Sequence, residues 1–156
     1  MTRVIHTVPP GGARDAWVEL LQLADEPTPL RRELQNGVLY GLGDGDGRPL
    51  AAVLVIEGTD GSPELRAVAV AEEHQGEGVG SWLVAEICER LRASGERRVV
   101  VGTASSGLRQ LGFYQRLGFR VARVERDFFT PERGYPADLS ENGIPSRDIV
   151  WMDRLL

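Results

Sequence analysis

The chain has 156 residues, of which 42% are hydrophobic and 26% charged, and these proportions are typical of a single soluble globular domain over residues 1–156. The net charge of −5 argues against general nucleic-acid binding, and no apolar run or signal peptide points to a membrane, so we expect a cytoplasmic protein. All 18 basic residues are arginines, which excludes a catalytic lysine, and the lone Cys88 excludes an intrachain disulfide.

Hydrophobic periodicity predicts helices and then strands in the first half of the chain. We expect a strand over 3–8, an amphipathic helix over 13–24, further helical turns over 30–35, and strands over 38–42, 49–57 and 64–71. Short turns rich in glycine and aspartate join the last three strands, which is typical of an antiparallel meander. Asp44-Gly45-Asp46 could also begin a calcium loop, but the later carboxylate of an EF-hand is missing.

The second half alternates helices with strands. An amphipathic helix follows Gly80 and ends at Ser94-Gly95, with Cys88 on its apolar face. We then expect a strand over 97–103, a helix over 108–117, and strands over 119–127 and 149–155. This order predicts a mixed α/β fold, with helices on both faces of one sheet.

The segment before the long helix is the most informative. It reads Gln75-Gly76-Glu77-Gly78-Val79-Gly80-Ser81, a glycine-rich turn that opens a helix. Up to four backbone N–H groups at such a helix start have no intrahelical partner, and they favour an anion such as a pyrophosphate. A Walker loop needs a lysine, and Leu83 stands where a dinucleotide fingerprint needs a third small residue.

Gln75-x-x-Gly78-x-Gly80 resembles the signature of the GNAT superfamily, the acyl-CoA-dependent N-acetyltransferases. Val68-Ala69-Val70 before it and Phe113-Tyr114-Gln115-Arg116-Leu117-Gly118-Phe119 after it match the flanks of that signature. Other stretches, including 103–106 and 127–129, resemble a small uncharacterised bacterial subgroup of the family. The resemblance implies a mostly antiparallel sheet of about seven strands, flanked by helices and with splayed central strands.

The resemblance also implies acetyl-CoA as co-substrate, with no metal, between the strand ending at Val70 and the strand ending at Thr103. The Val70 N–H is then expected to polarise the thioester carbonyl. Gly107 stands where the family often has an asparagine, so nearby serines could contact the pantetheine arm or cap the next helix. The implied cofactor-binding residues are Val68, Ala69, Val70, Gln75, Gly76, Glu77, Gly78, Val79, Gly80, Ser81, Thr103, Ser105, Ser106 and Tyr114.

Tyr114 matches the general acid of the family, which protonates the leaving thiolate of CoA, although it could also simply pack beside its phenylalanine neighbours. Glu64 is our first candidate for the base that deprotonates the acceptor amine, and Asp127 is the second. The alternatives are a solvated strand-edge residue for Glu64 and a turn residue for Asp127. Glu125 and Asp148 are weaker candidates, and we expect His74 to be exposed and without a catalytic role.

We therefore predict an N-acetyltransferase in which a primary amine attacks acetyl-CoA directly in a ternary complex. The alternatives are a non-catalytic acyl-CoA-binding sensor and a covalent route through Cys88. The acceptor is a small-molecule or peptide amine, and the excess of acidic residues in the first half favours a cationic one. We expect residues 128–147 to wall the acceptor pocket together with Trp17 or Leu30, or to form a homodimer contact.

Overall fold

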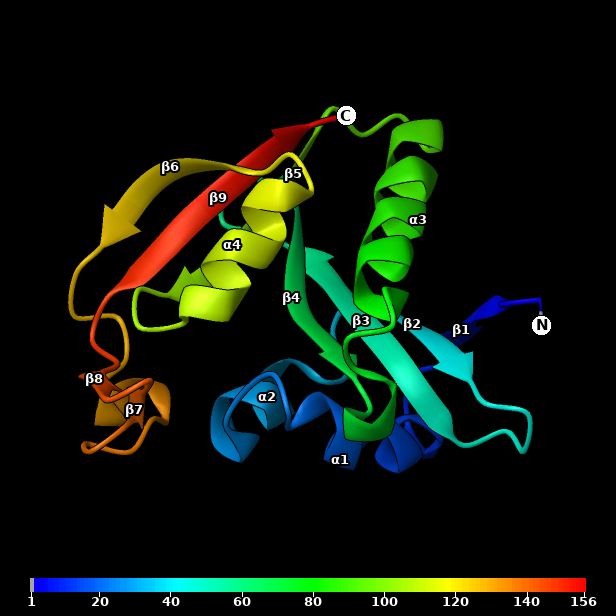
Figure 1. Ribbon diagram of the computed structural model, residues 1–156, viewed down its shortest axis with the longest axis horizontal. Helices are drawn as coiled ribbons and strands as arrows, with labels where there is room; N and C mark the ends of the chain where they lie inside the picture. The colour runs from blue at the N-terminus through cyan, green and yellow to red at the C-terminus, as the bar shows by residue number, and fades with distance from the viewer. Residues whose placement is uncertain (1) are drawn as a thin grey trace.

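The computed structural model describes residues 2–156 and is built around one seven-stranded sheet with the strand order β1-β2-β3-β4-β5-β9-β6 (Figure 1). Its strands are β1 (Ile5–Val8), β2 (Val38–Gly43), β3 (Pro49–Glu57), β4 (Pro63–Val70), β5 (Arg98–Ala104), β6 (Arg120–Glu125) and β9 (Ile149–Leu155). All neighbouring strands are antiparallel except β4 and β5, which are parallel. The predicted mixed, mostly antiparallel sheet is confirmed.

Helices cover both faces of this sheet. They are α1 (Val18–Leu21), α2 (Pro27–Glu33), α3 (Val79–Ala93) and α4 (Leu108–Arg116). Figure 1 shows α1 and α2 below β3 and β4, α3 on the opposite side of these two strands, and α4 beside β5 and β9. Strand β3 is buried on both faces, because Val53 packs into the core under α3 while Leu54 packs into the core over α1 and α2. Cys88 lies in the first of these cores, as predicted, and burial raises the pKa of its thiol.

The first helical region differs from the single helix predicted over 13–24. A 3₁₀ helix (Gly12–Trp17) precedes α1, and α2 begins at Pro27, before the helical turns predicted over 30–35. Proline is favoured in the first turn of a helix, so it starts α2 here. Within the 3₁₀ helix the buried Arg14 side chain donates hydrogen bonds to the carbonyls of Val8 and Leu34.

The two central strands separate soon after they meet. The only β4–β5 register pair in residues 2–156 is Glu64 with Val100, near the start of β4. Two residues later β4 contains a β-bulge, because Leu54 and Val55 of β3 pair with Ala67 and Leu65 and leave Arg66 without a partner. A bulge bends its strand. The strands therefore diverge toward Val70 and Ala104, which is the predicted splay.

The long segment between β6 and β9 contains structure that the sequence did not predict. It holds a 3₁₀ turn (Pro131–Arg133) and a two-stranded hairpin of β7 (Ser140–Glu141) and β8 (Ile144–Pro145). Gly134, near the middle of this segment, packs against Thr28 and Pro29 of α2. The segment therefore connects the β6–β9 side of the splay with the α2 side. No helix in the part of the chain that the structure describes has the length and apolar character needed to cross a membrane.

Candidate active site

A groove of about 450 Å³ follows β4 and ends at the start of α3; we call it the glycine groove. Its walls come from β4, the turn before α3, the first residues of α3, β5 and α4. The lining residues include Val68, Ala69, Val70, His74, Gln75, Gly76, Gly78, Val79, Gly80, Ser81, Thr103, Arg109, Phe113, Tyr114 and Arg116. Most of the residues predicted to hold the cofactor therefore lie along one surface.

The start of α3 presents backbone donors to this groove. Gly76 and Gly78 have φ angles of 80° and 78°, a region that other residues rarely adopt, and a Cβ added at either would meet no atom within 4 Å. No side chain caps α3, and the first α-helical hydrogen bond after the turn is donated by Trp82 to the carbonyl of Gly78. The preceding N–H groups of α3 thus have no intrahelical acceptor, which favours an anion.

The exposed edge of β4 continues this row of backbone groups. The Ala71 N–H donates to the Leu50 carbonyl across the β3–β4 pair (2.8 Å). Because alternate residues of an antiparallel strand point their backbone groups in opposite directions, those of Val68 and Val70 point away from β3 and into the splay. The Gln75 side chain donates to the Val70 carbonyl (3.0 Å) and so ties the turn to the end of β4.

Helix α4 forms the opposite wall. The Tyr114 ring is 7% exposed and packs edge-to-face on Phe113 and Phe119, with centroid distances of 5.0 and 5.5 Å. Burial raises the pKa of its phenol above the ordinary value, so the hydroxyl keeps its proton at neutral pH. Arg109 and Arg116 line the same wall, and the sequence reasoning missed them. Their spacing of seven residues, with Phe113 between them, was the available signal for one helix face.

A second cavity, of about 960 Å³, opens beside α2 and the segment 128–147; we call it the charged cavity. It meets the glycine groove at the splay, where six residues line both spaces: Leu23, Ala24, Arg66, Gly102, Thr103 and Gln110. A ligand along the groove can therefore touch a second ligand in the cavity. Phe128, Phe129 and Tyr135 of the long segment line this cavity. Trp17 and Leu30 do not, because both are buried in the core under α1 and α2.

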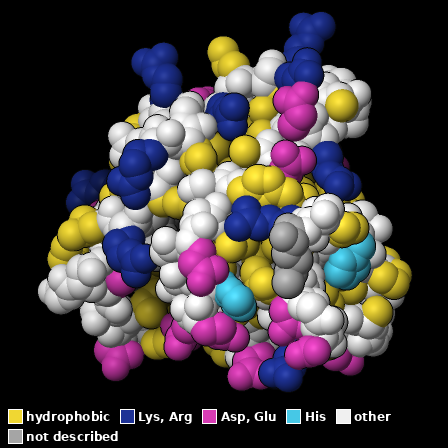
Figure 2. All heavy atoms as spheres, turned by 45° about the vertical axis from the view of Figure 1, so that its right-hand side comes forward, with side chains coloured by type: hydrophobic (Ala, Val, Ile, Leu, Met, Phe, Trp, Pro, Cys, Tyr) yellow, Lys and Arg dark blue, Asp and Glu magenta, His cyan; other side chains and the backbone are white. Residues whose placement is uncertain are grey.

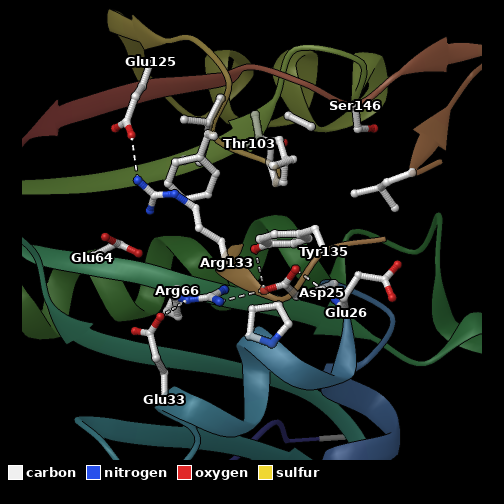
Figure 3. Close-up of a pocket in the computed structure, with 18 of the residues that line it drawn as sticks. Asp25, Glu26, Glu33, Glu64, Arg66, Thr103, Glu125, Arg133, Tyr135 and Ser146 are labelled. Carbon is white, nitrogen blue, oxygen red and sulfur yellow. Dashed lines mark hydrogen bonds and ion pairs between the residues drawn. The ribbon is translucent and has the colours of Figure 1, made fainter. Parts of the chain in front are cut away.

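Charged side chains dominate the floor of the charged cavity (Figure 3). Arg66 forms ion pairs with Asp25 (2.7 Å) and Glu33 (2.8 Å), and Asp25 also accepts a long hydrogen bond from the Tyr135 hydroxyl (3.4 Å). Glu64 has no ion pair with any described residue, and burial raises the pKa of its carboxyl to about 7, although Arg66 acts in the opposite direction. Such a carboxyl can exchange a proton near neutral pH.

A family model described as the acetyltransferase (GNAT) family matches residues 13–119. The chain belongs to the GNAT acetyltransferase family. It is 37% identical over 138 residues to the uncharacterised N-acetyltransferase YvbK of Bacillus subtilis strain 168, which covers 87% of this chain and 86% of that protein. The predicted family is therefore confirmed.

Solved GNAT structures share the whole fold. A Bacillus subtilis acetyltransferase in complex with CoA matches with a TM-score of 0.86 and 30% identity, over 99% of both chains. A GNAT acetyltransferase from Elizabethkingia anophelis with acetyl-CoA bound matches with a TM-score of 0.84 and 27% identity, over 99% of this chain and 98% of that one. The chain thus has the fold of GNAT proteins that hold CoA or acetyl-CoA.

Two serines predicted to contact the cofactor line neither the glycine groove nor the charged cavity. The Ser106 side chain is fully buried and shares a 2.7 Å hydrogen bond with Ser146, while the Ser105 N–H donates to the Asp148 carbonyl. Neither serine lines the groove, which corrects the expected pantetheine contact, and α4 has no side-chain cap, which corrects the alternative. The pair instead anchors the segment 128–147 beside α4.

Two acidic residues are also placed elsewhere. The Asp127 side chain is 66% exposed, lies 3.4 Å from Arg147 and lines neither space, so the structure does not bring it to the site. Its positive φ of 54° marks it as the turn residue of the alternative interpretation. Glu77 points to the His74 ring (3.3 Å) and does not line the groove, whereas Glu125, a weaker candidate, does line the charged cavity.

Proposed function

We propose that the protein transfers the acetyl group of acetyl-CoA to a primary amine by direct attack in a ternary complex. The observation that carries this proposal is the junction of the two spaces: a groove of unpaired backbone donors meets a charged cavity at six shared residues. Membership of the GNAT family and the CoA-bound structural neighbours support the same reaction class.

The glycine groove fits the chemistry of a nucleotide thioester. The N–H groups of Val79, Gly80 and Ser81 suit a pyrophosphate, and the guanidinium groups of Arg109 and Arg116 supply positive charge along the same groove. The backbone groups of Val68 and Val70 can pair with the amides of a pantetheine arm, as an added strand would. Acetyl-CoA supplies the activated acyl group when it is bound.

The position of Glu64 favours the Val68 N–H over the predicted Val70 N–H as the donor to the thioester carbonyl. At about 3.3 Å per residue, Val68 lies roughly 13 Å along β4 from Glu64, and Val70 roughly 20 Å. The nearer donor leaves space for an amine, or an amine and one water molecule, between Glu64 and the reacting carbonyl. The Val68 N–H then stabilises the negative charge that develops on the carbonyl oxygen.

Glu64 acts as the base in this proposal. It takes one proton from the substrate ammonium, and the free amine then attacks the carbonyl carbon and breaks the carbon–sulfur bond. Raising the carboxyl pKa from 4.5 to about 7 lowers the free-energy cost of that proton transfer by roughly 3 kcal/mol. The Tyr114 hydroxyl donates a proton to the departing sulfur and recovers one from the new amide nitrogen, so one proton leaves through Glu64.

The lining of the charged cavity favours an acceptor with a second positive charge. Eight acidic side chains face four arginines, and Arg66, Arg123 and Arg133 are already paired with Asp25, Glu33 and Glu125. The carboxylates without an ion pair among the described residues are Glu26, Glu57, Glu64, Glu132 and Glu141. Figure 2 shows the wider charge asymmetry, with acidic side chains along the lower edge of its face and arginines mainly above them.

An amine panel tests the proposal. The probes are 1,5-diaminopentane, pentylamine and 6-aminohexanoate, which differ in the group at the far end, and a thiol reagent measures CoA release. We expect kcat/KM for the diamine to exceed that for the other two by about tenfold or more, since one charge-assisted contact contributes about 1.5–3 kcal/mol. Calorimetry measures acetyl-CoA binding separately. Binding without turnover of any amine would favour the sensor, and no binding would contradict the proposal as a whole.

A further inference from the structure

Arg66 occupies the one position of β4 that has no partner on β3. A bulged residue is re-aimed relative to its neighbours, and here the Arg66 side chain reaches the boundary between the glycine groove and the charged cavity. Only 13% of the side chain is exposed. Its charge therefore acts on both spaces through little intervening water.

Two carboxylates fix the direction of this guanidinium (Figure 3). Asp25 Oδ2 accepts from one terminal nitrogen of Arg66, and Glu33 Oε1 accepts from Nε. Asp25 is itself held at its other oxygen, which accepts the Glu26 N–H at 2.8 Å, and its side chain is 11% exposed. Arg66 is thus bound from the α2 side of the charged cavity. Burial lowers the pKa of its guanidinium, but the two carboxylates together raise that pKa above its ordinary value.

Glu64 lies two residues before Arg66 on the same strand, and both side chains line the charged cavity (Figure 3). The charged groups that act on its carboxyl are Arg66 from its own strand, Glu33 from α2, and Asp60 from the β3–β4 turn, which is paired with Arg98. A long arginine side chain could turn to Glu64 from this position, yet it is engaged elsewhere. Among the described residues Arg66 is the cation that acts on the Glu64 carboxyl, and its two acidic partners engage its guanidinium in ion pairs of their own.

On the basis of the base role proposed above, we propose that Asp25 and Glu33 are positioning residues: they hold Arg66 toward α2 and keep Glu64 without an ion-pair partner. Glu64 then remains able to accept a proton from the acceptor amine. If Arg66 paired with Glu64 instead, the carboxylate would be stabilised and would become a weaker base.

Carboxyl NMR of protein labelled at the glutamate δ-carbon tests this directly and needs no acceptor. The Glu64→Gln variant assigns the signal. In Asp25→Asn, whose carboxylate is not among the charges that act directly on Glu64, we expect Glu64 to titrate about one pH unit or more below its wild-type midpoint, because Arg66 loses one of the two partners that hold it toward α2 and can pair with Glu64. Glu33→Gln should lower the midpoint further, because it also removes the direct repulsion between Glu33 and Glu64. In Arg66→Gln, we expect the opposite direction, because a cation is lost and two carboxylates are left unneutralised.

Three further measurements make the test specific. Glu26→Gln removes a carboxylate of the same cavity that does not touch Arg66, so Glu64 should titrate as in the wild type; Glu33→Asp keeps the charge and should restore the wild-type midpoint. Amide spectra verify the fold of each variant, and Glu33, at 31% exposed, is the more tolerant of the two sites. An unchanged Glu64 midpoint in Asp25→Asn, even with a fall in Glu33→Gln, or a fall in Arg66→Gln, would overturn the inference.

Activity separates this inference from the proposed function. If Glu64 is the base, the acid limb of kcat/KM for 1,5-diaminopentane moves with the NMR midpoint in every variant. An NMR midpoint that moves without a change in the acid limb would keep the positioning role and remove Glu64 from catalysis.

Discussion

The glycine groove and the charged cavity meet at the splay of β4 and β5, but they offer a ligand different kinds of atoms. The groove presents mainly backbone N–H and C=O groups, fixed by Gly76, Gly78 and the start of α3. The cavity presents ionisable side chains from α2, β4, β6 and the segment 128–147. Backbone recognition tolerates changes in most side chains, whereas the cavity depends on each carboxylate. We therefore expect single substitutions to separate the two regions.

The largest effect is expected at Glu64. Glu64→Gln should lower kcat/KM for 1,5-diaminopentane by about 10²- to 10³-fold at neutral pH, as loss of a general base does, while the Kd of acetyl-CoA stays unchanged. In the wild type kcat/KM should rise as the pH increases through about 7, because Glu64 loses its proton there. The exposed Asp127 provides the matched control, and an equal loss in Asp127→Asn would contradict the assignment.

A bulky residue in the glycine turn should damage the other region. Gly78→Val places a β-branched side chain at a φ of 78° and into the groove, so we expect the Kd of acetyl-CoA, measured by calorimetry, to rise about 100-fold. Gly61→Val imposes similar backbone strain at a φ of 83° in the β3–β4 turn, with nothing within 4 Å of the added Cβ. That variant should lose stability without losing affinity; equal affinity losses would show that strain alone is responsible.

Tyr114→Phe should have a smaller effect. We expect kcat to fall about tenfold, because a CoA thiol with a pKa near 8.5 leaves with only partial help from an acid. The melting temperature should change little, since the Tyr114 hydroxyl has no hydrogen-bond partner among the described residues that the fold would lose. A large fall in melting temperature with unchanged kcat would instead support the packing role.

The smallest effect is expected at Gln75. Gln75→Leu removes one hydrogen bond to the Val70 carbonyl, which corresponds to about 1 kcal/mol, so the KM for acetyl-CoA should rise about fivefold. Kinetics at saturating 1,5-diaminopentane measure this change, and kcat should remain near the wild-type value. Gln75→Glu should raise this KM further, because its carboxylate cannot donate to the carbonyl and adds negative charge to the groove proposed to hold the pyrophosphate.

The sequence predicted the groove better than the cavity, and the difference has a physical cause. Residues 75–81 form a local turn whose glycines and helix start depend on neighbours in the chain, so their spacing alone predicts the geometry. The pairing of Arg66 with Asp25 joins residues 41 positions apart and depends on a bulge that leaves no signal in the hydrophobic pattern. Glu64 was predicted as the base from its place at the start of the strand whose far end forms the cofactor contact, and its role as the base remains a prediction.

Ser105 and Ser106 are residues for which the sequence suggested a ligand contact that the structure does not contain. Their sequence position, close to the end of β5 and the start of α4, suggested a polar contact to a ligand. The buried bond between Ser106 and Ser146 depends on the path of a segment 40 residues later, which local pattern does not encode. The β7–β8 hairpin in that segment was missed for a similar reason, because each of its strands has only two residues.

The single β4–β5 register pair makes the sheet two half-sheets, β1 to β4 and β5-β9-β6, hinged at Glu64 and Val100. A molecule that forms hydrogen bonds with the free edges of β4 and β5 bridges the two half-sheets, and the bridge is lost when that molecule leaves. Backbone amides at the ends of β4 and β5 should exchange with deuterium faster without acetyl-CoA than with it. The exchange rates of amides in β2 and β3 should be the same with and without the ligand.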